Sequence, residues 1–405
     1  MHQRSVLKVG SSLLIASLAL SACGSRGGTA STTASSNKTA VIGIMAPLSG
    51  SLSALGLGIQ HSVELAVTQA NASNTIPGWT LKTEAKDDQA LPDVGKNAAT
   101  AFAAEPNVAG VVGNLNSSVS QSTQPVLATA KIVQVSPADT NPSLTQGANF
   151  ATAPVRTYAT YFRTCTTDAV QGPYAARYLF QTAHITKVAT INDKKVYGQG
   201  LVAAFTKEFK ALGGIITDAE TINPDESNFQ AVISKVKPTS PNAVYYGGEY
   251  PQAGPLSQQM KAANLNVPLM GGDGIYDPKY VALAGTTANG DLATSVGAPT
   301  DSLAAGKKFL ADYAAAGYKD PAAAYGAYSY DAANAIINAL KVSLKSATDV
   351  ASFRQATIDA LGKVNFAGVT GPVAFDKFGD SVSRVLTVYK IVSLKWVPVQ
   401  TGAFK

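Results

Sequence analysis

Short apolar runs alternate with longer segments of helical periodicity along most of the chain, and this alternation restricts the fold more than any other feature. Residues 108–112 and 132–135 have the length and β-branched content of buried parallel strands. Residues 117–131 between them have the length of a crossover helix. A strand, a helix and a second strand of this kind form a βαβ unit with parallel strands. The sequence therefore predicts an α/β fold.

The alternation occurs in two blocks, separated near residue 165. The first block predicts strands at 39–46, 80–85, 108–112 and 132–135, with helices at 59–70, 93–104 and 117–131. The second predicts strands at 187–191, 214–221, 243–246 and 267–270, with helices at 170–182, 198–212, 228–236 and 255–263. Helices at 303–316, 322–344 and 351–361 and a strand at 385–392 follow. Each block predicts a doubly wound parallel sheet at the centre of its own lobe.

The N-terminal segment is a targeting sequence. Basic Arg4 and Lys8 precede an apolar run that ends at Leu20-Ser21-Ala22-Cys23 and is too short to span a bilayer. It resembles the lipobox of bacterial lipoproteins, which predicts a lipoprotein signal peptide at 1–22 and lipidation of Cys23. The alternative is an ordinary secretory signal that contains a cysteine.

Residues 24–38 consist almost entirely of Gly, Ser, Thr and Ala, so residues 23–38 are predicted to be a lipidated cysteine and a flexible tether. The domain is therefore expected at the cell membrane, lipid-anchored on the extracytoplasmic face. The whole chain has a formal charge of +6, and the mature charge is +4 once Arg4 and Lys8 are removed with the signal peptide. The sequence contains no basic run or aromatic-interleaved patch, which argues against a nucleic-acid partner.

The sequence offers no assembly of catalytic or metal-binding side chains. Once Cys23 is assigned to lipid, Cys165 is a single thiol, and a small buried thiol is a better interpretation than a nucleophile or metal ligand. His61 and His184 are isolated in predicted helices. No enzyme activity, metal or cofactor is therefore expected.

Polar and aromatic side chains follow the carboxyl ends of the predicted strands, where open parallel sheets bind their ligands. In the first block these are Asn116, Ser117, Ser118, Ser136, Asp139 and Thr140. In the second they are Asp193, Tyr197, Glu249, Tyr250, Asp273 and Tyr276. Ser117 is expected at a helix N-cap, where its hydroxyl and the free N–H groups could receive a carboxylate. The pattern predicts a ligand cleft between two lobes, the alternative being caps and turns that bind nothing.

A series of segments resembles the motifs of one known family, the leucine/isoleucine/valine-binding proteins of ABC transporters, within the type I periplasmic-binding fold. They follow the family's order over essentially the whole mature domain. The segments are MAPLSG at 45–50, KDDQ at 86–89, GNLNSS at 113–118, SPADTNPSLT at 136–145, QGPYAARY at 171–178, NDKKVYGQG at 192–200, YYGGEYPQAG at 245–254, MGGDG at 270–274 and GPVAFD at 371–376.

The resemblance implies two discontinuous lobes joined by a three-strand hinge. Their expected extents are 39–165 plus 297–384 and 166–296 plus 385–405, with crossovers near Thr166, Val296 and Val385. It implies a monomeric substrate-binding protein that captures a small amino acid, most simply a branched-chain or aliphatic one, and delivers it to an ABC permease. Alternatives are another amino acid or small amide as ligand, or a lipid-anchored sensor of the same fold.

The resemblance also implies how an α-amino acid would be held. Its carboxylate would meet Ser117 and Thr140, and its ammonium the Ala138 carbonyl, the Thr140 hydroxyl and Asp273. A zwitterion needs such partners because desolvating an unpaired charge is costly. The ligand-binding set expected in full is Leu115, Asn116, Ser117, Ala138, Asp139, Thr140, Tyr197, Glu249, Asp273 and Tyr325.

Two residues depart from the family pattern. Leu55 replaces a pocket tyrosine of the first loop, which favours an aliphatic ligand. Glu249 stands where relatives often have an aromatic residue. Its carboxylate is expected to bond a second polar group of the ligand, to pair with a nearby cation, or to lie solvated at the rim. For Asp193 and Tyr250, capping and hinge packing are at least as good an interpretation as ligand contact.

Overall fold

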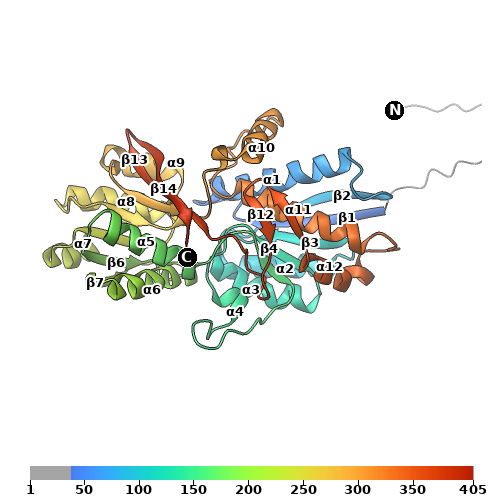
Figure 1. The fold of residues 1–405 in the computed structure, drawn as a ribbon, viewed down its shortest axis with the longest axis horizontal. Helices are drawn as coiled ribbons and strands as arrows, with labels where there is room; N and C mark the ends of the chain where they lie inside the picture. Colours follow the sequence, from blue (N-terminus) through green and yellow to red (C-terminus); the bar gives the residue numbers. More distant parts are fainter. Residues whose placement is uncertain (1–37, 405) are drawn as a thin grey trace, which may run out of the picture. The chain divides into compact units, whose positions relative to one another are not determined.

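The computed structural model describes residues 38–404, which are built around two sheets (Figure 1). The predicted signal peptide, Cys23 and the tether up to residue 37 lie outside the described residues. No helix within 38–404 has both the length and the apolar character needed to cross a bilayer.

The first sheet is parallel throughout, with the order β2-β1-β3-β4-β5. Its strands are β1 (Lys38–Ala46), β2 (Trp79–Asp87), β3 (Val108–Gly113), β4 (Val133–Ser136) and β5 (Tyr161–Arg163). Its helices are α1 (Ser53–Ala72), α2 (Pro92–Ala104), α3 (Ser117–Thr129), α4 (Ser143–Gln146), α10 (Ala304–Ala315), α11 (Gly326–Ser343) and α12 (Arg354–Leu361). A small antiparallel pair, β11 (Asn365–Gly368) and β12 (Gly371–Ala374), lies beside α11. We call this half the sheet-1 side.

The second sheet has the order β14-β13-β10-β9-β8-β6-β7. Its strands are β6 (Lys187–Asn192), β7 (Ile215–Thr221), β8 (Ala243–Gly247), β9 (Leu269–Gly271), β10 (Leu292–Ser295), β13 (Val385–Val392) and β14 (Lys395–Ala403). Its helices are α5 (Asp168–Arg177), α6 (Val196–Ala211), α7 (Gln230–Val236), α8 (Tyr250–Ala262) and α9 (Pro278–Ala284). We call this half the sheet-2 side. The sheet is mixed rather than wholly parallel, because the C-terminal hairpin β13–β14 adds two antiparallel strands.

Both sheets are covered by helices on both faces, as a doubly wound fold requires. The interior of the sheet-1 side packs α2 and α3 against one face and α1, α11 and α12 against the other. On the sheet-2 side, α5 and α6 cover one face and α7, α8 and α9 the other. All six residues of β3 are therefore buried, which explains its unbroken apolar sequence.

The chain passes between the sheets three times, at 164–167, 296–299 and 382–384, in segments without regular secondary structure. The expected crossover positions Thr166 and Val296 lie within two of these segments, and Val385 begins β13. The three segments lie side by side, because residues from each line one small cavity. They form the covalent connection between the two sides.

Candidate functional site

A small cavity lies where the sheet-1 and sheet-2 sides meet, at the carboxyl ends of their strands. Its free volume is about 10 Å³, enough for about one water molecule. Its lining comes from both sides: Leu115, Asn116, Ser117, Ala138 and Tyr325 from the first, and Tyr197, Glu249, Asp273 and Gly274 from the second. The structure thus brings together eight of the ten sequence-predicted site residues, and adds Gly274, which has no side chain to signal a role.

The beginning of α3 supplies hydrogen-bond donors to the cavity. Asn116, with an extended backbone (φ −104°, ψ 125°), is the N-cap and Ser117 is the first helical residue, so the expectation of Ser117 at the N-cap was wrong by one position. The Asn116 carbonyl accepts the N–H groups of Val119 and Ser120. Within the described part of the chain, the N–H groups of Ser117 and Ser118 have no acceptor. They are the free donors of a helix N-terminus and favour an anion.

Asp273 provides the opposite chemistry from the sheet-2 side. Its Oδ1 accepts hydrogen bonds from Gln171 Nε2 and from the Tyr197 hydroxyl, each at 2.8 Å, and its Oδ2 accepts one from the Tyr325 hydroxyl at 2.9 Å. The Tyr197 oxygen in turn accepts the N–H of Gly274 at 3.1 Å. Burial raises the pKa of Asp273, although these hydrogen bonds oppose the shift. An acid fixed by three donors is suited to receive an ammonium group.

Glu249 is buried and paired, so its interpretation as a solvated rim charge was wrong. The residue is 3% exposed. Its Oε2 lies 2.8 Å from Lys195 Nζ, and its Oε1 accepts a hydrogen bond from Asn116 Nδ2 at 2.8 Å. Burial, the largest single effect, raises the pKa of Glu249, but the Lys195 ammonium together with side-chain hydrogen bonds, among them that from Asn116, holds that pKa below its usual range. Pairing with a cation, one of the expected alternatives, is confirmed.

Asp139 and Thr140, although predicted as ligand-binding residues, do not line the cavity. The Ser136 hydroxyl accepts the N–H of Asp139 at 2.9 Å and so forms a tight turn. That turn directs the Asp139 carboxyl inward, where it accepts hydrogen bonds from the hydroxyls of Ser120 and Tyr161. Burial raises the pKa of Asp139 to about 7. Asp139 thus supports the turn rather than facing a ligand.

Thr140 and Asp168 lie behind the cavity. The Asp168 N–H donates to the Thr140 carbonyl at 2.8 Å, and burial raises the pKa of the Asp168 carboxyl to about 8. The Thr140 hydroxyl is buried and has no hydrogen-bond partner among the described residues.

Two further expectations concern Leu55 and Cys165. Leu55 lies in the first turn of α1 and packs in the core, so it does not shape this cavity and carries no argument for an aliphatic ligand. Cys165 is a free buried thiol, as predicted, and burial raises its pKa well above the usual value. Among residues 38–404, no group of His, Cys, Asp and Glu side chains is placed to hold a metal ion.

Direct hydrogen bonds connect the two sides around the cavity. Asn141 Nδ2 donates to the Val196 carbonyl at 2.8 Å, and the Val196 N–H donates to Ser118 Oγ at 3.2 Å. The Tyr250 hydroxyl donates to the Ser51 carbonyl. With the Asn116–Glu249 and Tyr325–Asp273 bonds, they hold the site closed.

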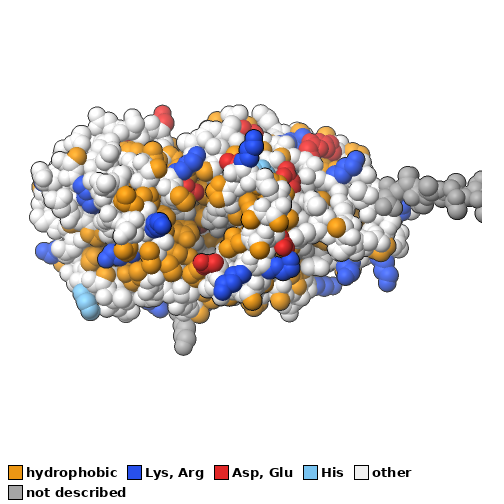
Figure 2. All heavy atoms as spheres, turned by 90° about the horizontal axis from the view of Figure 1, so that it is seen from above, with side chains coloured by type: hydrophobic (Ala, Val, Ile, Leu, Met, Phe, Trp, Pro, Cys, Tyr) orange, Lys and Arg blue, Asp and Glu red, His pale blue; other side chains and the backbone are white. Residues whose placement is uncertain are grey.

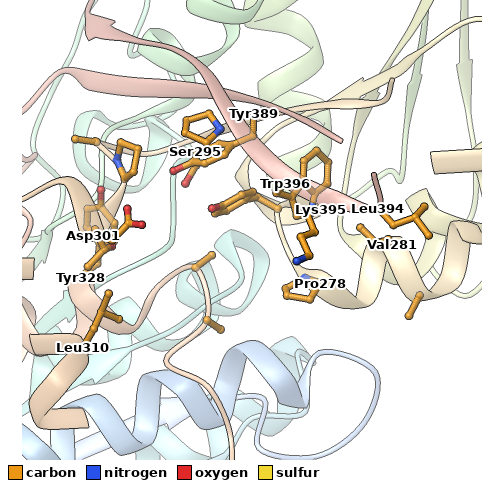
Figure 3. A pocket seen from close by; sticks show the side chains of 18 residues that line it. Pro278, Val281, Ser295, Asp301, Leu310, Tyr328, Tyr389, Leu394, Lys395 and Trp396 are labelled. Atoms are coloured by element: carbon orange, nitrogen blue, oxygen red, sulfur yellow. The ribbon is translucent and has the colours of Figure 1, made fainter. Parts of the chain in front are cut away.

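A larger cavity, of about 730 Å³, contains none of the predicted site residues. It opens on the face turned to the viewer in Figure 2, where hydrophobic side chains gather beside a hollow. Figure 3 shows Asp301 and Leu310 on one side of it, and Pro278, Lys395 and Trp396 on the other. Of these two cavities, the smaller one combines free helix N–H groups with a buried acid, so we take it as the candidate site.

Comparison with known proteins identifies the family of the chain. A sequence profile described as periplasmic binding protein matches residues 39–395. The chain is 32% identical over 350 residues to Leu/Ile/Val-binding protein homolog 1 of Brucella abortus, covering 86% of this chain and 90% of that protein. It is 30% identical over 352 residues to the Leu/Ile/Val-binding protein BraC3 of Rhizobium johnstonii, with the same coverage of each.

Solved structures share the fold. The branched-chain amino acid transporter substrate-binding protein LivJ from Streptococcus pneumoniae, in complex with isoleucine, has a TM-score of 0.79 at 26% identity, over 90% of this chain and 100% of that chain. An ABC transporter solute-binding protein from R. palustris, in complex with benzoate, has a TM-score of 0.78 at 21% identity, over 90% and 96%, and shares the fold alone. The predicted type I periplasmic-binding fold is thereby confirmed. By sequence and by fold, the chain belongs to the periplasmic binding protein family, whose members bind substrates for transport and are not enzymes.

Proposed function

We propose that this chain is the extracytoplasmic substrate-binding protein of an ABC transporter, and that it captures an α-amino acid in the small cavity and delivers it to the permease. The observation that carries the proposal is the pairing, across one cavity, of the α3 N-terminus with Asp273. The relatives named as Leu/Ile/Val-binding proteins support the amino-acid class.

The two charged ends of the ligand would have separate partners. The N–H groups of Ser117 and Ser118, with the Ser117 hydroxyl, would receive the carboxylate, and Thr140 would join them. Asp273 and the Ala138 carbonyl would receive the ammonium. Each partner offsets a desolvation cost of several kcal/mol that an unpaired charge would incur.

Binding requires the site to open and close. A free volume of about 10 Å³ is far below the roughly 150 Å³ that holds benzene, so a ligand cannot enter the closed site. The crossings at 164–167, 296–299 and 382–384 would act as the hinge between two lobes, 39–165 plus 297–384 and 166–296 plus 385–405. A ligand that touches both lobes stabilises the closed form, which the permease then receives. No bond of the ligand is made or broken.

We further propose that lipid on Cys23 anchors the protein to the outer face of the cell membrane. The lipobox-like Leu20-Ser21-Ala22-Cys23 supports this. Detergent phase partitioning tests it: the wild-type protein is expected in the detergent phase and a Cys23→Ser variant in the aqueous phase. Equal partitioning of both would overturn the anchor.

A thermal-shift screen of the chain from residue 24 onward tests the ligand class, since a ligand that binds only the folded form raises Tm. We expect a shift with at least one α-amino acid. The same amino acid with its carboxylate esterified, or with its amine acetylated, is expected to produce none. A shift with no α-amino acid would contradict the proposed function.

A further inference from the structure

The orientation of the Asn116 side chain at the cavity wall is dictated by Glu249. An ionised carboxylate only accepts hydrogen bonds, so the group 2.8 Å from Glu249 Oε1 must be the Asn116 amide nitrogen. The Asn116 oxygen Oδ1 is therefore on the other branch. It is buried and has no hydrogen-bond donor among the described residues.

Glu249 is itself unable to adopt another role. Lys195 holds its second oxygen at 2.8 Å, and an ammonium only donates. Asn116 and Glu249 are 4% and 3% exposed, so solvent does not replace these contacts. Lys195 and Asn116 Nδ2 thus both donate to Glu249, which leaves Oδ1 as the free acceptor of Asn116, a residue that lines the cavity.

The other polar side chains of the cavity do not satisfy this acceptor. The hydroxyls of Tyr197 and Tyr325 both donate to Asp273. The Ser117 hydroxyl oxygen accepts the Asn141 N–H at 3.5 Å and makes no bond to Asn116. Leu115 contributes only apolar atoms. A buried carbonyl without a donor is uncommon and costly in native proteins, which indicates that a molecule in the cavity supplies the missing hydrogen.

We infer that the ligand's side chain donates a hydrogen bond to Asn116 Oδ1, so the preferred ligand is an α-amino acid with a carboxamide or hydroxyl side chain rather than a purely aliphatic one. The inference rests on the proposed function, because that function assigns the ligand carboxylate to the α3 N-terminus and the ammonium to Asp273, which leaves the ligand side chain to meet Asn116. Asn116 is the specificity-determining residue of the site, and Lys195 and Glu249 fix the orientation of the Asn116 side chain.

Pairs of amino acids with nearly equal shape test the inference. Asparagine carries an amide oxygen and nitrogen where leucine carries two methyl groups. Threonine carries a hydroxyl where valine carries one of its methyl groups. By calorimetry we expect the polar member of at least one pair to bind at least tenfold more tightly. Equal or tighter binding of both leucine and valine would overturn the inference while the proposed function stands. Absence of binding by every α-amino acid would overturn both.

A Glu249→Gln variant provides a second, independent measurement. Lys195 must face the oxygen of the new amide, whose nitrogen then faces Asn116. The Asn116 oxygen turns to that nitrogen, and its own nitrogen turns to the cavity. The preference for the polar member is expected to fall at least tenfold. Glu220→Gln, which removes the exposed Glu220–Lys235 pair (2.9 Å), is the matched control and is expected to keep the preference. An unchanged preference in Glu249→Gln would overturn the inference.

Discussion

Asp273 is the acid on which the proposed recognition of an amine depends. It is 1% exposed and accepts three hydrogen bonds, one of them from Tyr325 on the sheet-1 side. Removing its charge leaves a ligand ammonium buried without a counter-ion, whereas the neutral amide of asparagine keeps the same shape.

We therefore expect Asp273→Asn to weaken α-amino-acid binding by about 2–4 kcal/mol, as for an uncompensated buried charge. Titration calorimetry measures the loss. Asp301→Asn, at the larger cavity, is the control and is expected to bind like the wild type. Unchanged affinity in Asp273→Asn would place the ammonium elsewhere.

At the residue scale, sequence reasoning located the residues that follow strands but not their partners. Ser117 and Asp273 were predicted because carboxyl ends of parallel strands meet at one edge of a sheet. The Lys195–Glu249 pair was not, since the two residues are 54 positions apart and no sequence pattern links them. Asp139 was misplaced because a side-chain hydrogen bond from its own turn, at Ser136, decides its direction.

At the scale of elements, α6 approaches the sheet-1 side most closely at Gly200. A Cβ added there would lie 2.3 Å from Asn141 Nδ2 and 3.1 Å from Asp168 Oδ2. Asn141 is the residue that bonds the Val196 carbonyl across the two sides. The absence of a side chain at Gly200 therefore permits the closed contact.

Gly200→Ala is expected to weaken ligand binding by about 1–3 kcal/mol, because overpacking disfavours the closed form. Its unfolding free energy should change by less than its binding free energy, because opening relieves the contact with Asn141 and because alanine favours the helix over glycine by roughly 0.5–1 kcal/mol. Calorimetry and urea denaturation separate the two effects. The exposed Ala203→Gly, in the same helix, should show the reverse: lower stability and unchanged affinity. Wild-type affinity in Gly200→Ala would contradict this account of closure.

Asp168, in the first turn of α5, makes stability depend on pH. Its pKa is about 8 in the folded protein, against about 3.8 as the usual value. Between these values the folded state holds a proton that the unfolded state has lost, so stability falls as pH rises.

In Asp168→Asn this decline from about pH 5 to about pH 8 should be shallower, by up to about 1.4 kcal/mol per pH unit. Urea denaturation over that range measures it. The exposed Asp225→Asn, on the surface of the sheet-2 side, should keep the wild-type slope. An identical slope in Asp168→Asn would show that Asp168 is ionised throughout.

Most long elements were predictable because their periodicity is strong, and the misses have local causes. The strands β5 and β10 contain only two apolar residues each, Tyr161–Phe162 and Leu292–Ala293, too few to form the continuous apolar run by which the equally short β4 and β9 were predicted. β14 is an edge strand with mostly exposed side chains, so its sequence is not apolar enough to stand out. The helix expected from residue 322 begins at Gly326, because Ala323 has a φ of +53° that no α-helix accommodates.

At the scale of the whole molecule, the two sides form hydrogen bonds with each other directly. Asn116–Glu249 and Tyr325–Asp273 cross the site itself, so the closed form needs no bridging ligand. Asn116 and Asp273, which would contact a ligand, thus also take part in the hydrogen bonds that keep the two sides closed. Capture must then wait for opening.

We expect the observed rate of ligand association to level off as ligand concentration rises, at the rate of opening. Stopped-flow fluorescence measures it. Tyr250→Phe, which removes the hydroxyl bonded to the Ser51 carbonyl, should raise the plateau. A rate that rises linearly throughout would mean that the open form predominates in solution.

The partial burial of the Lys195–Glu249 pair makes it less sensitive to the salt concentration around the protein. Outside the cytoplasm the cell does not control ionic strength, and dissolved salt screens exposed charges beyond about 10 Å at about 0.1 M. Glu249 is buried and the Lys195 side chain is 22% exposed, and a zwitterion brings no net charge to the site. Ligand binding at such a site should therefore depend only weakly on salt concentration.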